Sequence, residues 1–462
     1  MAQKVSVRGF PIAFDGLSCC SNAKDPLDIL KKASASSAFH DAEARFDPPK
    51  CHPRTRIAVL AKIMDWILAR DEETRDALIM WLTGAAGAGK SSIAQSIVEN
   101  CLKESDGLIL ACFFFNRSDS TRNHARLLAT TLAYQIYRAL PAIQSQITAV
   151  INDDPLIVTK NLDYQFTTLI MEPLQALHKF GQLTQTQPRR LIVLDGLDEC
   201  ISRTSQVSIL NVISNAVRTF KLPVVFLIAS RPEHDIRETF SSAEMVGVHT
   251  CVMLDDRYKP DEDIRIFLND SIRRIKEKHP FRRMISTTWP GEEVIETLVA
   301  KSSGQFIYPA TVIKFIDSIR HRPDHRLEMV LKLRATGHEK PFEQLDMLYR
   351  HILSCIDREI IGKVLTMFGY IFTWPKFETY GTMISINHFM PLDDGELSIL
   401  LCDLGALVQL NKVRSGISSV RVWHASLVDF FSDRERSQEF YIDVQDTFTR
   451  IVTRCLQIIP SA

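Results

Sequence analysis

One short segment restricts the possible folds of this chain more than any other feature of its sequence. Residues 84–91 read GAAGAGKS, a full match to the pattern GxxxxGK[ST]. An apolar run typical of a buried strand precedes the segment, and a helical pattern follows it. In this setting, glycines let backbone N–H groups turn inward around a polyphosphate, and the helix N-terminus adds its positive dipole end. The sequence therefore predicts a phosphate-binding loop in an α/β sheet, with a glycine-rich turn that merely starts a helix as the alternative.

The polar side chains after the glycines complete the predicted phosphate site. Lys90 is expected to reach the β and γ phosphates of a bound nucleotide, and the Ser91 hydroxyl is expected to coordinate Mg²⁺. The pattern by itself does not choose between ATP and GTP. The residues of this segment predicted to contact ATP or ADP are Gly84, Ala85, Ala86, Gly87, Ala88, Gly89, Lys90, Ser91 and Ser92.

A second segment supplies the acidic residues that such a site needs. Residues 191–199 read LIVLDGLDE, so an apolar run leads to Asp195 at the carboxyl end of a buried strand. Ligands of open α/β sheets bind at that end of the strands, and Asp195 is therefore predicted to hold Mg²⁺ together with Ser91. Asp198 and Glu199 follow directly and are predicted catalytic residues that polarise an attacking water. The alternative is an acidic loop that only solubilises the end of a strand.

A third segment places an arginine at the end of another predicted strand. Residues 227–232 read LIASRP, in which Arg231 follows an apolar run. The planar guanidinium binds phosphate in a fixed geometry. Arg231 is therefore a third candidate catalytic residue, which reaches the γ-phosphate and reports its presence, with a surface ion pair as the alternative.

Apolar runs that alternate with helical patterns place these segments in one domain. Continuous apolar runs separated by helices describe a parallel sheet covered on both faces. The predicted strands are Leu78–Thr83, Leu108–Phe115, Arg190–Leu194, Leu222–Ala229 and Val248–Leu254. The stretch between Leu140 and Arg190 looks irregular. The predicted fold class is thus an α/β P-loop NTPase with a mostly parallel five-stranded sheet.

The remainder of the chain divides into a leader and a mostly helical second half. The strand signal fades after Asp261, and a helix at Leu397–Leu410 followed by a hairpin and another helix suits a small winged-helix module. Pro309 inside a helical pattern predicts a kink. The expected division is a poorly ordered leader at 1–50, a nucleotide-binding domain at 51–258, a helical domain at 259–340, a winged-helix domain at 341–440 and a C-terminal helix at 441–462.

Charge and composition narrow the possible partners and compartments. Lys plus Arg and Asp plus Glu both number 55, so the zero net charge favours neither a nucleic acid nor an anionic membrane as partner. No apolar run approaches the roughly 18 residues of a membrane span, and the N-terminus lacks an apolar signal-peptide core. The 10 cysteines form no CxxC pair, which argues against structural zinc. A cytoplasmic location is therefore expected.

These motifs together resemble those of the NACHT group of STAND-type, NLR-like P-loop NTPases. The segments WLTGAAGAGKSS, LIVLDGLDEC and IASRPE look most like the fungal members, whose nucleotide domain is akin to the nephrocystin-like N-terminal module. The glycine between the acids, Gly196, is typical of NACHT proteins, and CHPRTR at 51–56 looks like their lead-in. The resemblance covers roughly residues 50–440.

The resemblance implies further contacts to the nucleotide. In related signalling ATPases, a histidine at the start of the helix after the winged-helix hairpin touches the β-phosphate of ADP. The matching residue is His424 in WHASLVDFF, which adds it to the candidate nucleotide-binding residues; the alternative is a histidine that caps its own helix or packs in the core. Thr55 and Arg56 border the adenine pocket by the same resemblance, with a plain helix N-cap as the alternative.

The resemblance also implies a function. ADP and the winged helix would hold the chain closed, and exchange for ATP with Mg²⁺ would release the second half for self-association or mixed oligomers with related NACHT proteins. Slow hydrolysis would reset the switch, in fungal non-self recognition or programmed cell death. Two alternatives stay open: a continuously cycling AAA-like ATPase, and a non-hydrolysing nucleotide-binding scaffold or truncated regulator of longer relatives.

Overall fold

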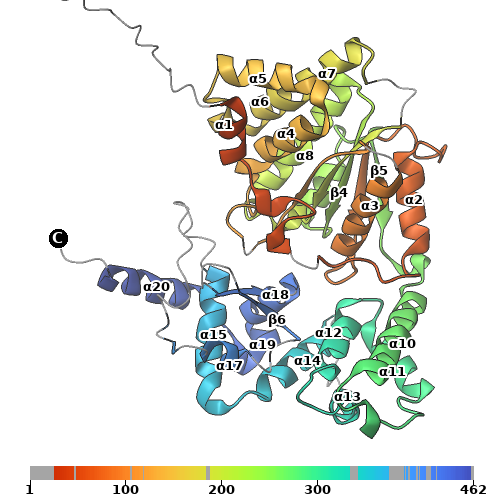
Figure 1. Cartoon of the computed structure of the whole chain (residues 1–462), viewed down its shortest axis with the longest axis vertical. Coiled ribbons are helices and arrows are strands. Elements are labelled where there is room, and N and C mark those ends of the chain that lie inside the picture. Colours follow the sequence, from red (N-terminus) through yellow and green to blue (C-terminus); the bar gives the residue numbers. More distant parts are fainter. Residues whose placement is uncertain are drawn as a thin grey trace, which may run out of the picture.

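The structure of the chain is a computed structural model. It describes residues 25–45, 48–104, 107–117, 119–183, 188–332, 342–373, 390, 392–393, 396–401, 404, 406–412, 418–422 and 424–458. An α/β half, formed by the first half of the chain, lies above a mostly helical second half in Figure 1.

The regular elements alternate in the first half and are mostly helices in the second. The strands are β1 (Ile79–Thr83), β2 (Ile109–Phe114), β3 (Arg190–Asp195), β4 (Val224–Ser230), β5 (His249–Met253), β6 (Val408–Lys412) and β7 (Ser418–Val422). The α-helices of the first half are α1 (Pro26–Lys32), α2 (Ile57–Ile67), α3 (Lys90–Glu104), α4 (Leu128–Ala139), α5 (Gln144–Asp153), α6 (Leu162–Phe166), α7 (Glu172–Lys179), α8 (Arg203–Phe220) and α9 (His234–Phe240). Those of the second half are α10 (Pro260–Lys278), α11 (Glu292–Ser302), α12 (Ile307–Ile316), α13 (Pro323–Lys332), α14 (Glu343–Ser354), α15 (Arg358–Thr373), α17 (Glu396–Leu400), α18 (Ala425–Ser432), α19 (Arg434–Ser437) and α20 (Val444–Ile458).

The sheet of the first half has the order β2–β3–β4–β1–β5, and all of its neighbouring pairs are parallel. Strands β1 to β4 are almost entirely apolar and buried because both of their faces are covered, whereas the edge strand β5 buries only Val252. In β1, Ile79 and Trp81 face the core under α4 to α8, whereas Met80 and Leu82 face the core under α2 and α3. Figure 1 shows these two helix layers on opposite sides of the sheet. The predicted five-stranded parallel sheet is confirmed.

The stretch before β3 is helical and not irregular, contrary to the prediction. It contains α5, α6 and α7, of which α5 buries Ile147 and Ile151 against the core of α4. The apolar residues Ile143, Ile147 and Ile151 recur every four positions, which is the spacing of one helix face. The apolar spacing of a helix is therefore present in the sequence, but the polar residues between these positions make it hard to recognise.

The segment predicted as a poorly ordered leader is partly packed onto the α/β half. Helix α1 buries Leu30 completely, and Ser34 Oγ donates to the Thr130 carbonyl at 3.1 Å. The expectation is therefore wrong for residues 25–45, because α4 supplies the apolar partner that a short segment cannot provide for itself. Residues 1–24 of the predicted leader lie outside the described residues.

The second half has its own hydrophobic core. The apolar clusters of the α/β half extend to Val252, and the next cluster begins at Ile264 in α10. That cluster continues to Phe430 in α18, so the regions predicted as separate helical and winged-helix domains share one core. No described helix is both long enough and apolar enough to cross a bilayer.

Two predictions for the second half need correction. The antiparallel hairpin β6–β7 precedes α18 as predicted, but β6 starts at Val408, so the predicted helix over Leu397–Leu410 is wrong beyond Leu400. Pro309 does not kink α12, because that helix begins at Ile307. Proline in the first turn removes no intrahelical hydrogen bond.

Candidate nucleotide-binding site

The strand order brings the three sequence motifs to one edge of the sheet. The glycine loop follows β1, Asp195 ends β3, and Arg231 comes directly after β4. Strand β4 lies between β1 and β3, and all three run parallel, so their carboxyl ends are adjacent. Ligands of open α/β sheets bind at this edge.

The glycine loop has the backbone geometry of an anion cradle. Gly87 and Gly89 have φ angles of +78° and +93°, a region that side chains disfavour. The two loop alanines Ala86 and Ala88 are buried. Ile93 N donates to the Gly89 carbonyl at 3.0 Å, which starts α3, so the loop ends at a helix N-terminus as the motif predicts.

Lys90, at the start of α3, lies inside this cradle. Its Nζ donates to the carbonyls of Gly84 at 2.8 Å and Ala85 at 3.0 Å. Burial lowers the pKa of Lys90, while the nearby Asp198 carboxylate acts in the opposite direction. The loop therefore holds a positive charge at the place where the motif requires one.

The environment of Asp195 fits a magnesium ion. Asp195 is 4% exposed, and burial raises its pKa to about 6, although a hydrogen bond from Ser91 favours the charged form. Among the described residues, no hydrogen-bond partner meets Asp195 Oδ1. An orphaned buried carboxylate oxygen beside a hydroxyl suits a small cation that prefers oxygen ligands. Ser91 and Asp195 would hold this ion.

The two acids after Asp195 have different surroundings. They lie in the 3₁₀ turn η7 (Leu197–Glu199), which Gly196 enters with a φ of +73°. Asp198 Oδ1 accepts from Arg231 N at 2.9 Å, and its Oδ2 lies 3.2 Å from Arg231 Nε. Burial, followed by the Asp198 charge, raises the pKa of Glu199 to about 7. Glu199 is thus suited to accept a proton near neutral pH, whereas Asp198 contacts Arg231.

Arg231 connects the nucleotide site to the second half of the chain. Its Nη1 donates to Asp429 Oδ2, in α18, at 2.7 Å. Burial opposes the positive charge, but Asp429 and Asp198 outweigh it and raise the pKa of Arg231. Arg117, which the sequence motifs did not reveal, also contacts Asp429, with its Nη1 3.2 Å from Oδ1.

The structure shows His424 as a helix cap, which is the alternative that the sequence left open beside a nucleotide contact. It is the N-cap of α18, and its Nδ1 accepts from Ser426 N at 3.0 Å. Burial, followed by the charges of Arg231 and Lys90, lowers the pKa of His424 to about 4. The imidazole is therefore neutral, with Nε2 carrying the proton because Nδ1 is an acceptor. A helix-capping histidine thus lies within electrostatic reach of the glycine loop.

The predicted lead-in also reaches the glycine loop. Arg56 Nη2 donates to the Ala88 carbonyl at 2.9 Å, and the Arg56 guanidinium lies over the Phe306 ring at 4.8 Å. Thr55 does not cap α2, because Arg56 holds the N-cap position and the Thr55 hydroxyl donates to the His52 carbonyl. Arg56 thus contacts both the loop and the second half, a role that no motif marked.

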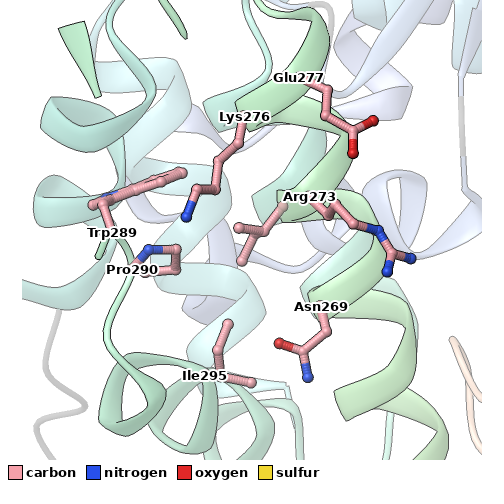
Figure 2. Close-up of a pocket in the computed structure, with 8 residues that line it drawn as sticks. Asn269, Arg273, Lys276, Glu277, Trp289, Pro290 and Ile295 are labelled. Atoms are coloured by element: carbon pink, nitrogen blue, oxygen red, sulfur yellow. The ribbon is translucent and has the colours of Figure 1, made fainter. Parts of the chain in front are cut away.

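A separate pocket lies in the second half. It has a volume of about 390 Å³ and lies between α10 and the Trp289–Pro290 segment. Figure 2 shows Lys276 pointing toward Trp289, whereas Arg273 points away from it. None of its lining residues belongs to the predicted nucleotide site; they are Asn269, Ile272, Arg273, Lys276, Glu277, Trp289, Pro290 and Ile295.

Two solved structures are distantly similar to this chain. Drosophila ORC bound to DNA aligns with a TM-score of 0.38 and 12% identity, over 82% of this chain and 96% of that one. Aeropyrum pernix ORC1 in complex with DNA aligns with a TM-score of 0.35 and 14% identity, over 86% and 94%. These scores are too low to support a functional conclusion.

Comparison of the sequence with known families gives a more specific result. Residues 61–231 match the family model described as Nephrocystin 3, N-terminal. Vegetative incompatibility protein HET-E-1 of Podospora anserina is 24% identical over 347 residues, which are 71% of this chain and 23% of that protein. The chain thus spans about a quarter of the length of this curated relative. These similarities support a NACHT-type nucleotide-binding module of the nephrocystin-3 N-terminal kind over residues 61–231.

Proposed function

We propose that this chain is an ATP/ADP switch of the STAND type that hydrolyses ATP slowly with Mg²⁺. The observation that carries the proposal is the contact between Arg231, beside the glycine loop, and Asp429, in the second half. In this proposal Arg231 contacts the terminal phosphate, and the contact with Asp429 joins it to α18, the helix that moves in the switch. A switch needs only two arrangements with different affinities for the two nucleotides.

In this proposal each residue of the site has its own role in binding or hydrolysis. The loop N–H groups and Lys90 bind the phosphates, and Ser91 and Asp195 hold the magnesium ion. When bound, that ion supplies positive charge to the phosphate oxygens. Glu199 accepts the proton of the attacking water, and Asp198 orients Arg231 toward the terminal phosphate. His424 donates its Nε2 proton to the β-phosphate of ADP and favours the closed arrangement.

We further propose that nucleotide exchange controls self-association. Release of the second half exposes the surfaces that now meet the α/β half, and these surfaces become available to other copies or to longer related NACHT proteins. HET-E-1 is named a vegetative incompatibility protein. By extension, the output of this switch belongs to fungal non-self recognition or programmed cell death.

The nucleotide that co-purifies with the chain tests the proposed function. We expect chromatography of the denatured protein to release ADP, with ATP turnover far below 1 s⁻¹ in the isolated chain. Turnover near or above about 1 s⁻¹, the ordinary range for enzymes, would instead identify a continuously cycling ATPase. ATP that stays uncleaved for days with Mg²⁺ would identify a scaffold, and co-purifying GDP would exclude an adenine switch.

Substitution of Glu199 by Gln is expected to separate hydrolysis from binding. Glutamine keeps an oxygen that accepts from Arg117 N, now at 3.1 Å from Glu199 Oε2, but it cannot take a proton. General base catalysis contributes about 10²–10⁴-fold, so single-turnover hydrolysis should slow by about 100-fold or more while ATP affinity stays within about threefold. An unchanged hydrolysis rate would remove Glu199 from the mechanism.

Substitution of His424 by Leu is expected to weaken ADP binding and promote association. Because His424 also caps α18, loss of the cap alone would cost about 1 kcal/mol. The matched variant His424→Asn keeps a capping oxygen but is too short to reach a phosphate. Both variants should lower ADP affinity in calorimetry and increase the mass in light scattering. If only His424→Leu does so, the histidine acts as a cap and not as a nucleotide contact.

A further inference from the structure

Two arginines of the α/β half share one carboxylate of the second half. Arg231 Nη1 donates to Asp429 Oδ2 at 2.7 Å, and Arg117 Nη1 donates to Asp429 Oδ1 at 3.2 Å. Each carboxylate oxygen therefore receives one guanidinium. Asp429 lies 198 residues from Arg231 and 312 residues from Arg117 in the sequence. These three residues, called here the Asp429 triad, meet because α18 is docked against the carboxyl edge of the sheet.

Asp198 and Glu199, in the turn after β3, also contact both arginines. Asp198 accepts from Arg231 N at 2.9 Å and pairs with Arg231 Nε at 3.2 Å. The Asp198 carbonyl accepts from Arg117 Nη2 at 3.2 Å, and Glu199 accepts from Arg117 N. Both guanidinium groups are thus held on the residues that face the terminal phosphate in the proposed mechanism. Each keeps one outer nitrogen, Nη1, for Asp429.

The partly buried setting makes this contact stronger than a surface ion pair. The Asp429 and Arg231 side chains are 21% and 20% exposed. Charges removed from water interact more strongly, and a buried charge that loses its partner is destabilising. Without an anion between them, Arg117 and Arg231 would also repel each other. Asp429 is therefore the carboxylate that both cations share, while Asp198 pairs with Arg231 in addition.

We propose that Asp429 competes with the γ-phosphate of ATP for Arg117 and Arg231. The inference rests on the proposed switch and adds the residue that links the third phosphate to movement of the second half. A phosphate binds arginine bidentately and carries more negative charge than a carboxylate. ATP therefore displaces Asp429, whereas ADP, which ends one phosphate earlier, leaves the triad intact. Arg117 acts with Arg231 as a positioning residue for the third phosphate.

Contacts within the second half transmit the release of Asp429. Tyr349 in α14 shares a hydrogen bond with Ser426 in α18, at 2.9 Å between the hydroxyl oxygens. Arg436 in α19 forms two hydrogen bonds with Asp346 in α14, at 3.0 and 2.8 Å. These hydrogen bonds connect α18 and α19 to α14 within the second half of the chain. Loss of the Asp429 contact therefore moves α14, α18 and α19 away together, and α18, a helix of eight residues, opens more often without the packing of the α/β half.

The variant Asp429→Asn tests the competition by hydrogen–deuterium exchange of the full chain. In the unmodified protein, amides of α18 should exchange about tenfold faster with a non-hydrolysable ATP analogue than with ADP. Asp429→Asn should exchange at the fast rate with ADP, and its preference for the ATP analogue over ADP should rise about tenfold in calorimetry. Asp446→Asn removes an exposed acid that pairs only within α20, with Arg450, and should match the unmodified protein.

Two further variants separate the proposal from a purely structural role. Asp429→Glu keeps the charge and should restore slow exchange in the ADP state. Arg117→Gln should lower affinity for the ATP analogue while leaving ADP affinity unchanged. Wild-type exchange and an unchanged nucleotide preference in Asp429→Asn would overturn the competition and leave the switch standing. Failure of the unmodified chain to bind either nucleotide would overturn both.

Discussion

Replacement of Lys90 by Ala is expected to abolish ATP binding while the chain stays folded. Lys90 Nζ contacts only the carbonyls of Gly84 and Ala85 among the described residues, so its removal leaves the loop backbone in place. An ammonium that meets phosphate in a partly desolvated site contributes far more than a surface charge. We expect calorimetry to show a loss of affinity of about 100-fold or more, with a thermal midpoint within a few degrees of the original.

Lys103→Ala provides the matched control for this variant. Lys103 is exposed on the same helix, α3, so the substitution has the same chemistry without the phosphate contact. Its ATP affinity should equal that of the unmodified protein. Normal ATP affinity in Lys90→Ala would contradict the assignment of residues 84–91 as the phosphate-binding loop.

Replacement of Gly87 by Ala is expected to damage both the glycine loop and its contact with the second half. An added Cβ would lie 2.2 Å from Ile307 Cγ2 and 2.8 Å from Ile307 Cβ. Ile307 N also donates to the Gly87 carbonyl at 3.3 Å, so α12 cannot move away without losing this bond. The left-handed φ adds about 1–2 kcal/mol and the overpacking about 1–3 kcal/mol. Denaturant unfolding should show a loss of about 2–5 kcal/mol, and nucleotide binding should disappear.

Gly247→Ala separates backbone strain from the clash. Gly247 has the same φ, +78°, but an added Cβ there meets no atom within 4 Å. This control should lose only about 1–2 kcal/mol and keep its nucleotide affinity. The double variant Gly87→Ala, Ile307→Ala should recover part of the loss, because the smaller side chain makes room. Equal destabilisation by Gly87→Ala and Gly247→Ala would show that the contact with α12 is unimportant.

The sequence predicted the sheet and the core of the site because these depend on neighbouring residues. Apolar runs of strand length identified the five parallel strands, and the motifs located the glycine loop, Asp195 and Arg231 at or just after the carboxyl ends of three of them. Parallel strands bring their carboxyl ends to one edge, so the local pattern implied a common site. The helices α5 to α7 and the start of β6 were missed where polar residues or a short turn obscured the periodic spacing of apolar residues.

The sequence by itself determined a parallel α/β sheet with a glycine loop, a buried acid and an arginine at its carboxyl edge. Only the tertiary structure decided how the second half meets that edge. Arg117 belongs to no motif, and Asp429 comes from a helix whose docking brings it to Arg231 across 198 residues. Such contacts leave no periodic pattern in the sequence, because they depend on how two hydrophobic cores pack and on which charged groups become neighbours in the folded chain.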